Sequence, residues 1–117
     1  MTADKVRLYV KLVTEVCSQY GMEPLITLTS LSPYCFDSTV PILFNRNDGN
    51  ETEQAQLCYE ALIKAGMKAG FLPYRVGIQS MESIVDTSQP FWQVVAKIKG
   101  AVDPNGILAP GRYSPII

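Results

Sequence analysis

The sequence contains no histidine, and its three cysteines form no recognisable pattern. Histidine is the commonest general base and metal ligand, so its absence removes the usual serine and cysteine hydrolase arrangements and most transition-metal sites. Cys17, Cys35 and Cys58 are odd in number and lie outside any CxxC spacing, which argues against a disulfide framework. We therefore expect no metal site, and reduced thiols in a cytoplasmic setting.

Long apolar runs, blocks of like charge and a glycine-rich phosphate loop are also missing. No stretch approaches the roughly 18 apolar residues that span a bilayer, and the N-terminus does not resemble a signal peptide. Ten basic and eleven acidic side chains give a net charge of −1. These features predict a soluble, unexported protein that binds neither nucleic acid nor a membrane.

The length and composition fit one globular domain. The chain has 117 residues, of which 47% are hydrophobic, and a chain of this size buries roughly two-thirds of its unfolded surface. This buried fraction gives the folded chain only a small margin of stability, which oligomerisation would increase. We expect a single domain over residues 1–117, with an irregular tail from about residue 103, where prolines and glycines exclude regular structure.

Apolar side chains at three- and four-residue steps predict helices over residues 2–21, 51–70 and 89–102. Caps are expected at the helix ends: Thr2 and Gly21 for the first, Asn50 with Glu53 for the second, and Ser88 with Pro90 for the third. The predicted apolar faces are Ala55, Cys58, Leu62, Ala65 and Ala69 in the second helix, and Phe91, Val94, Val95 and Ile98 in the third.

Two segments with a two-residue period, "EPLITLTSL" and "STVPILF", predict an antiparallel pair of strands, and a short third strand is expected near Tyr74. Pro41 indicates an edge position or a bulge. The order of elements predicts an α+β fold with helices on one face of an antiparallel sheet, containing most of a ferredoxin-like unit. So small a sheet is marginal, and we expect another chain to cover its edge or exposed face.

The segment "PYRVG" places a phenol, Tyr74, beside a guanidinium, Arg75. From the residues alone, the favoured interpretation is that Tyr74 packs in the sheet and Arg75 makes a surface ion pair. The alternative is that both side chains donate to an aryl oxygen. Phe36, Phe44 and Trp92 belong either to the core or to the wall of an aromatic pocket.

The tail segment "KIKGAVDPNGILAPGRY" resembles the C-terminal signature of the FAD-linked oxidases, in particular the vanillyl-alcohol oxidase and 4-cresol dehydrogenase branch. Further similar segments occur in the order of that branch: "GMEPLITLTSL", "ILFNRND", "ETEQAQ", "PYRVG" and "PFWQVVAKIKGAVDP". The resemblance covers nearly the whole chain. It implies the last part of the family's ferredoxin-like cap domain and the returning tail, without the upstream FAD-binding domain.

The resemblance also implies roles for three residues. Tyr74 and Arg75 would hold the phenolate oxygen of the substrate, and each charge-assisted hydrogen bond of this kind is worth about 1.5–3 kcal/mol. A stabilised phenolate makes the para carbon easier to oxidise. Arg112 would approach the pyrimidine end of the flavin, where a cation stabilises the charge of the reduced ring.

The function implied by the resemblance is that of a substrate-binding cap in a flavin-dependent oxidoreductase for para-substituted phenols. FAD is the family's cofactor, and we expect this chain alone to bind none and to be inactive until it associates with an FAD-binding domain. Two alternatives stay open. One is a free-standing homo-oligomer that binds a small aromatic, phenolic ligand without redox chemistry, and the other is a folded gene remnant.

Overall fold

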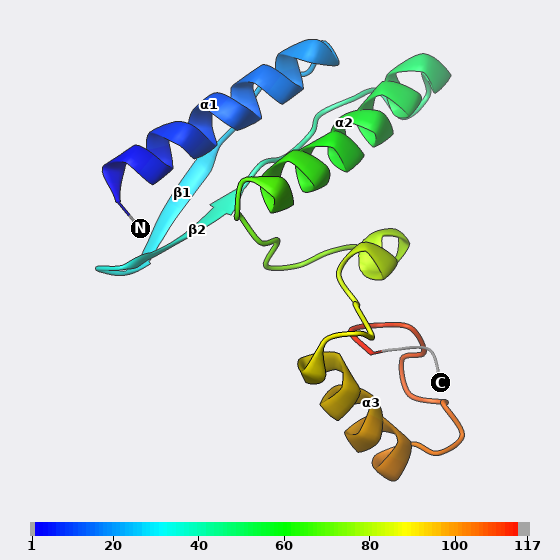
Figure 1. Ribbon diagram of the computed structural model, residues 1–117. Coiled ribbons are helices and arrows are strands. Elements are labelled where there is room, and N and C mark those ends of the chain that lie inside the picture. The colour runs from blue at the N-terminus through cyan, green and yellow to red at the C-terminus, as the bar shows by residue number, and fades with distance from the viewer. Residues whose placement is uncertain (1, 115–117) are drawn as a thin grey trace. The chain divides into compact units, whose positions relative to one another are not determined.

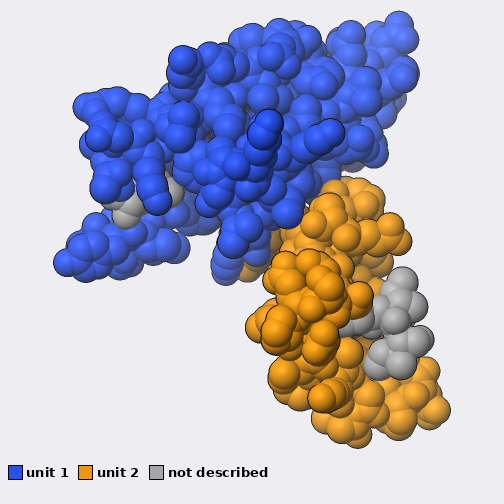
Figure 2. Space-filling model, in the orientation of Figure 1, with its two compact units in different colours: residues 1–74 blue, residues 75–117 orange. Residues whose placement is uncertain are grey.

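The computed structural model describes residues 2–114 and divides the chain into two compact units (Figure 1). Unit 1 comprises Met1–Tyr74 and unit 2 comprises Arg75–Ile117, as coloured in Figure 2. The boundary falls at the peptide bond between Tyr74 and Arg75. Within residues 2–114, no helix is long and apolar enough to cross a membrane.

Unit 1 contains two long helices that lie side by side, α1 (Ala3–Gln19) and α2 (Gly49–Lys68) (Figure 1). The Thr2 hydroxyl accepts a hydrogen bond from the Lys5 N–H at 3.4 Å, which confirms the predicted N-cap. Gly21 has a φ of 67°, and the Met22 N–H donates to the Cys17 carbonyl at 2.9 Å. This is the left-handed helix end that glycine favours, as predicted.

The predicted cap of α2 is wrong by two residues. Asp48, and not Asn50, is the N-cap, and its carboxylate accepts from the N–H groups of Asn50 and Glu51 at 2.8 and 3.2 Å. Glu51, and not Glu53, reaches back to the chain before the helix, where it accepts from the Asn45 N–H at 2.7 Å. The ionised Asp48 side chain satisfies two amide donors, so the helix begins earlier than an Asn50 cap would allow.

The two strands of unit 1 form an antiparallel hairpin, β1 (Thr27–Ser32) with β2 (Cys35–Thr39). The register pairs Thr27 with Thr39 and shifts between Ser30 and Ser32. β2 begins earlier than predicted and ends before Pro41, which has no N–H to donate to the ladder. With helices and an antiparallel pair, the α+β class is confirmed.

The core of unit 1 lies between the two helices. Val13 and Cys17 from α1 and Cys58 from α2 are buried. The partly buried residues around them are Tyr9, Leu12, Tyr20, Met22, Ile26, Val40, Ile42 and Leu62. Ile26, Val40 and Ile42 come from the chain next to the strands, so these flanks join the hairpin to the helices, whereas every residue of β1 is exposed.

Unit 2 contains a 3-10 helix, η1 (Ile78–Ser83), and the helix α3 (Pro90–Val102). The short strand predicted near Tyr74 is wrong, because residues 71–77 form neither a strand nor a helix. A strand requires a neighbour with which to exchange hydrogen bonds, and within residues 2–114 β1 and β2 pair only with each other.

The start of α3 differs partly from its prediction. Pro90 does occupy the first turn, but Gln89 is the N-cap and makes no side-chain cap bond. Ser88 does not cap the helix. Its hydroxyl instead donates to Asp86 Oδ1 at 2.6 Å, and the Gln89 amide donates to Asp86 Oδ2 at 3.0 Å. The carboxylate of Asp86 therefore organises the entry into α3.

The predicted core face of α3 is wrong for three of its four residues, since only Val95 among them is half-buried. Phe91, Val94 and Ile98 are exposed, and the side chain that α3 buries is Trp92. Phe91 packs edge-on against Trp92, with 5.0 Å between the ring centroids. The other buried side chains of unit 2 are Val76, Met81, Asp103 and Ser114. Because unit 2 is small, it covers only one face of α3, and the largest aromatic side chain, Trp92, lies on that face.

Candidate functional site

The segment "PYRVG", residues 73–77, links the two units. Tyr74 closes unit 1 with 74% of its side chain exposed, and Arg75 opens unit 2 and is also exposed. Val76, which follows, is buried. The phenolate-binding role of Tyr74 and Arg75 stays a prediction.

A hydrogen bond joins this segment to the tail of the chain. The backbone N–H of Val76 donates to the phenolic oxygen of Tyr113 at 3.0 Å, across 37 positions of sequence. Arg75 and Arg112 each precede one partner of this bond, and both are exposed. Unit 2 therefore brings together the segments that carry the two predicted cationic residues.

Sequence reasoning missed Tyr113. The available signal was a tyrosine directly after Arg112, in a tail that otherwise holds few large side chains able to anchor it. Its backbone φ is 50°, and that of Ala109 is 41°. A left-handed conformation costs a residue other than glycine about 1–2 kcal/mol. Such conformations persist where surrounding contacts impose them, so the tail is held in a defined shape.

A buried ion pair imposes part of that shape. Lys99 in α3 pairs with Asp103, and both side chains are largely buried. Asp103 Oδ1 accepts from the Ile107 N–H at 2.9 Å and Oδ2 from the Leu108 N–H at 2.8 Å, while Lys99 also donates to the Leu108 carbonyl. The "DPNG" turn thus folds around one carboxylate.

The ionisation of Asp103 is coupled to this network. The hydrogen bond from Lys99 is the largest cause that lowers the pKa of Asp103 below its usual range, and the amides of Ile107 and Leu108 add to it. Gly106 closes the turn with a positive φ of 63°, a conformation that glycine adopts readily. Sequence reasoning missed Lys99 and Asp103, although their four-residue spacing on a helix was the available signal.

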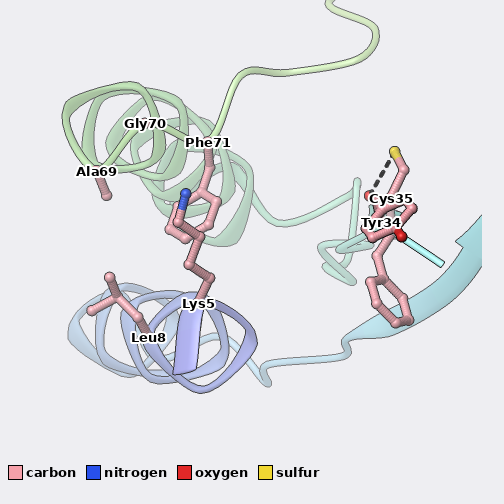
Figure 3. Close-up of a pocket in the computed structure, with 8 residues that line it drawn as sticks. Lys5, Leu8, Tyr34, Cys35, Ala69, Gly70 and Phe71 are labelled. Carbon is pink, nitrogen blue, oxygen red and sulfur yellow. Dashed lines mark hydrogen bonds between the residues drawn. The ribbon is translucent and has the colours of Figure 1, made fainter. Parts of the chain in front are cut away.

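Unit 1 has a separate hollow of about 350 Å³. It is lined by residues of α1, the end of α2 and the hairpin: Lys5, Leu8, Tyr34, Cys35, Phe36, Ala69, Gly70 and Phe71. Figure 3 shows the residues of the two helices on one side and Tyr34 and Cys35 on the other. Of the three aromatic residues considered from the sequence, Phe36 lines this hollow, and Trp92 belongs to the interior of unit 2.

The cysteines of unit 1 differ in environment. Cys17 and Cys58 are buried together, and Cys35 is exposed. Burial, the larger cause, and neighbouring Cys17 together raise the pKa of the Cys58 thiol to about 11. Among residues 2–114, no cluster of histidine, cysteine or acidic side chains could hold a metal ion.

Relatives of this chain include the two proteins that follow, whereas no family model matches the chain. The chain is 33% identical over 103 residues to 1'-carboxy-chondrochloren decarboxylase of Chondromyces crocatus. It is 31% identical over 98 residues to the 4-cresol dehydrogenase [hydroxylating] flavoprotein subunit of Pseudomonas putida. These alignments cover 88% and 83% of this chain, and 19% of each relative.

The fold matches that of one solved structure in particular detail. The crystal structure of p-cresol methylhydroxylase with substrate bound aligns with a TM-score of 0.81 and 28% identity, over 91% of this chain and 21% of that one. The chain thus spans about one fifth of the length of the proteins that it matches. These findings confirm the resemblance found in the sequence. The chain is a homologue of the 4-cresol dehydrogenase flavoproteins and corresponds to about one fifth of such a protein.

Proposed function

We propose that this chain is the substrate-binding cap portion of a flavin-dependent oxidoreductase that acts on para-substituted phenols, and that it works with an FAD-bearing remainder. The observation that carries the proposal is the hydrogen bond from the Val76 N–H to Tyr113. It joins the segment of Arg75 to the segment of Arg112, the residues assigned to the substrate and to the flavin. The likeness to the 4-cresol dehydrogenase flavoprotein subunit supports the choice of substrate class.

Tyr74 and Arg75 bind the phenolic oxygen in this proposal. A phenol O–H and a guanidinium N–H both donate, so together they favour the anionic form of the substrate. The negative charge that they stabilise is delocalised to the para carbon of the ring. That carbon then loses electrons more readily, which is the contribution of these two side chains to the reaction.

The fit of this chain to FAD is limited to one edge of the flavin. Bound FAD supplies a two-electron acceptor. Arg112 offers an exposed guanidinium for the negatively charged pyrimidine edge. The N-terminus of α2 is already occupied by the carboxylate of Asp48, which would repel a pyrophosphate. The dinucleotide is therefore held mainly by the remainder of the flavoprotein.

Substitution of Arg75 tests the proposal. Arg75→Ala removes one charged contact to the phenolate, and loss of at least about 1.4 kcal/mol weakens binding tenfold. Titration calorimetry with 4-cresol measures this, with the exposed Arg46 of unit 1 as the control in Arg46→Ala. Equal affinity of the Arg75→Ala chain and the unchanged chain would return Arg75 to a surface ion pair.

The hollow of unit 1 favours a second candidate function, a module that binds a small aromatic ligand without redox chemistry. Its volume of about 350 Å³ is within the range of small-molecule sites, roughly 300–1,000 Å³, and its wall includes Tyr34, Phe36 and Phe71. If this candidate is right, a colourless chain binds phenols and Phe36→Ala abolishes the binding, whereas Arg75→Ala leaves it unchanged.

A further inference from the structure

Helix α3 carries an exposed apolar stripe that unit 2 does not bury. The stripe consists of Phe91, Val94, Ile98 and Val102, whose side chains are between 54% and 70% exposed. Their spacing of three, four and four residues places them on one face of the helix. We call this face the α3 stripe.

The adjacent face of α3 already forms the interior of unit 2. Trp92 is 9% exposed, Val95 is half-buried, and Lys99 joins the Asp103 network. The apolar surface of α3 is therefore wider than the face that unit 2 covers. Helices with so wide an apolar surface are normally buried within a larger body. A unit of residues 75–117 is also close to the size, about 40 residues, below which a domain needs added stabilisation.

We propose that the α3 stripe is the docking surface through which this chain binds the FAD-bearing remainder of a flavoprotein of this family. The inference rests on the proposed function. The chain corresponds to 19% and 21% of the proteins that it matches, so about four-fifths of such a protein remains to cover it. The stripe has the chemistry of an internal surface, with apolar side chains of several shapes and no charge within it.

The size of the stripe favours this occupant over a second copy of the chain. Four apolar side chains bury at most roughly 500 Å², whereas a stable complex of separate proteins buries about 800 Å² on each partner. The rest of one large protein also contacts other surfaces of this chain, so together these contacts can bury the area that a stable complex needs. The strand β1, whose residues are all exposed, is a further surface that needs such cover.

The first arm of the test uses the chain by itself. Val94→Gln with Ile98→Gln makes the stripe polar, and Met81→Ala removes a buried side chain of the same unit. Thermal unfolding is followed by the fluorescence of Trp92, which all variants keep. We expect the stripe variant to unfold within about 2 °C of the unchanged chain and Met81→Ala to unfold clearly lower. A drop equal to that of Met81→Ala would mean that the stripe is buried within this chain, and the proposal would be wrong.

The second arm places the chain in a whole flavoprotein. In the Pseudomonas putida flavoprotein subunit, this chain replaces the homologous fifth, with and without the two stripe substitutions. We expect the chimera with the unchanged chain to retain FAD and the stripe variant to retain at least tenfold less and to unfold at lower temperature. Lys97→Gln, on the polar side of α3, serves as the control and should change neither.

Three outcomes contradict the proposal. These are equal FAD retention by the stripe variant and the unchanged chimera, no FAD retention by the unchanged chimera, and a dimer of the free chain that the stripe variant abolishes, which would identify a second copy as the occupant. Failure of the phenol-binding proposal is distinct. In that case the chimera assembles through the stripe, yet binds 4-cresol equally with Arg75 and with Arg75→Ala.

Discussion

Asp103 is the ionisable group on which the tail of unit 2 depends, and its stability contribution should vary with pH. Because the pKa of Asp103 is lowered in the folded chain, folding favours the carboxylate. The contribution is then complete above the unfolded pKa, about 4, and is lost as the pH falls through the lower folded value.

The prediction is that unit 2 loses urea resistance below about pH 4, and that Asp103→Asn removes this pH dependence. Trp92 fluorescence during urea unfolding at pH 7 and pH 3 measures it. The urea midpoint of the unchanged chain should be higher than that of Asp103→Asn at pH 7 and close to it at pH 3. If the two urea midpoints differ by the same amount at both pH values, the charge of Asp103 does not contribute to stability and only the shape of its side chain does. Lys99→Met should reduce the urea midpoint at pH 7 in the same direction.

The three thiols should react at very different rates. With a pKa of about 11, only about a thousandth of the Cys58 thiol is ionised at pH 8, and the thiolate is the reactive form. Cys17 is buried beside it, and Cys35 is exposed. We expect a disulfide reagent such as dithionitrobenzoate to modify Cys35 quickly and the other two only after urea is added. Three equivalents released at once from the folded chain would contradict the core described for unit 1.

Helix ends show how far local sequence determines an element. Thr2 and Gly21 were predicted correctly because each acts through its own backbone neighbourhood. The cap of α2 was misplaced because "NDGN" offers several capping residues, and only the fold selects Asp48. The strand near Tyr74 and the core face of α3 failed for another reason. Both depend on what covers them, and that is a property of distant chain rather than of local residues.

Gly21→Ala should destabilise unit 1 through backbone conformation alone. An added Cβ meets no atom within 4 Å, but the φ of 67° is unfavourable for alanine. The expected loss is about 1 kcal/mol. Gly49→Ala is the matched control, since it also meets no atom within 4 Å and lies at the start of α2 with no positive φ. Circular dichroism during thermal unfolding distinguishes them, and equal melting temperatures would remove the conformational argument for Gly21.

At the scale of the whole chain, the sequence predicted the α+β class and the relationship to FAD-linked flavoproteins, and both are confirmed. The expectation of one domain stays a prediction beside the two compact units. The sequence did not predict how much apolar surface the chain exposes, because periodicity shows which residues seek burial and not whether this chain supplies the cover. The hydrogen bond from the Val76 N–H to Tyr113 could not be predicted either, because periodicity does not show which distant segments meet.

The division into two units predicts where a protease cuts the folded chain. Native proteins are cleaved where the backbone is exposed and irregular. Residues 71–77 form no helix or strand, and Leu72 and Tyr74 are among the most exposed large side chains. Pro73 blocks chymotrypsin cleavage after Leu72, so brief treatment should cut first after Tyr74 and release residues 1–74 and 75–117, identified by mass spectrometry.

The other tyrosines supply the control within the same digest. Tyr9 packs edge-on against Phe71, with 5.1 Å between ring centroids, and lies within α1. Cleavage after Tyr9 should therefore wait until unit 1 unfolds. If Tyr9 is cut as early as Tyr74, the helices of unit 1 open as readily as the connecting segment. If the segment at Tyr74 resists while α3 is cut first, the boundary between the units is not where the chain is most accessible.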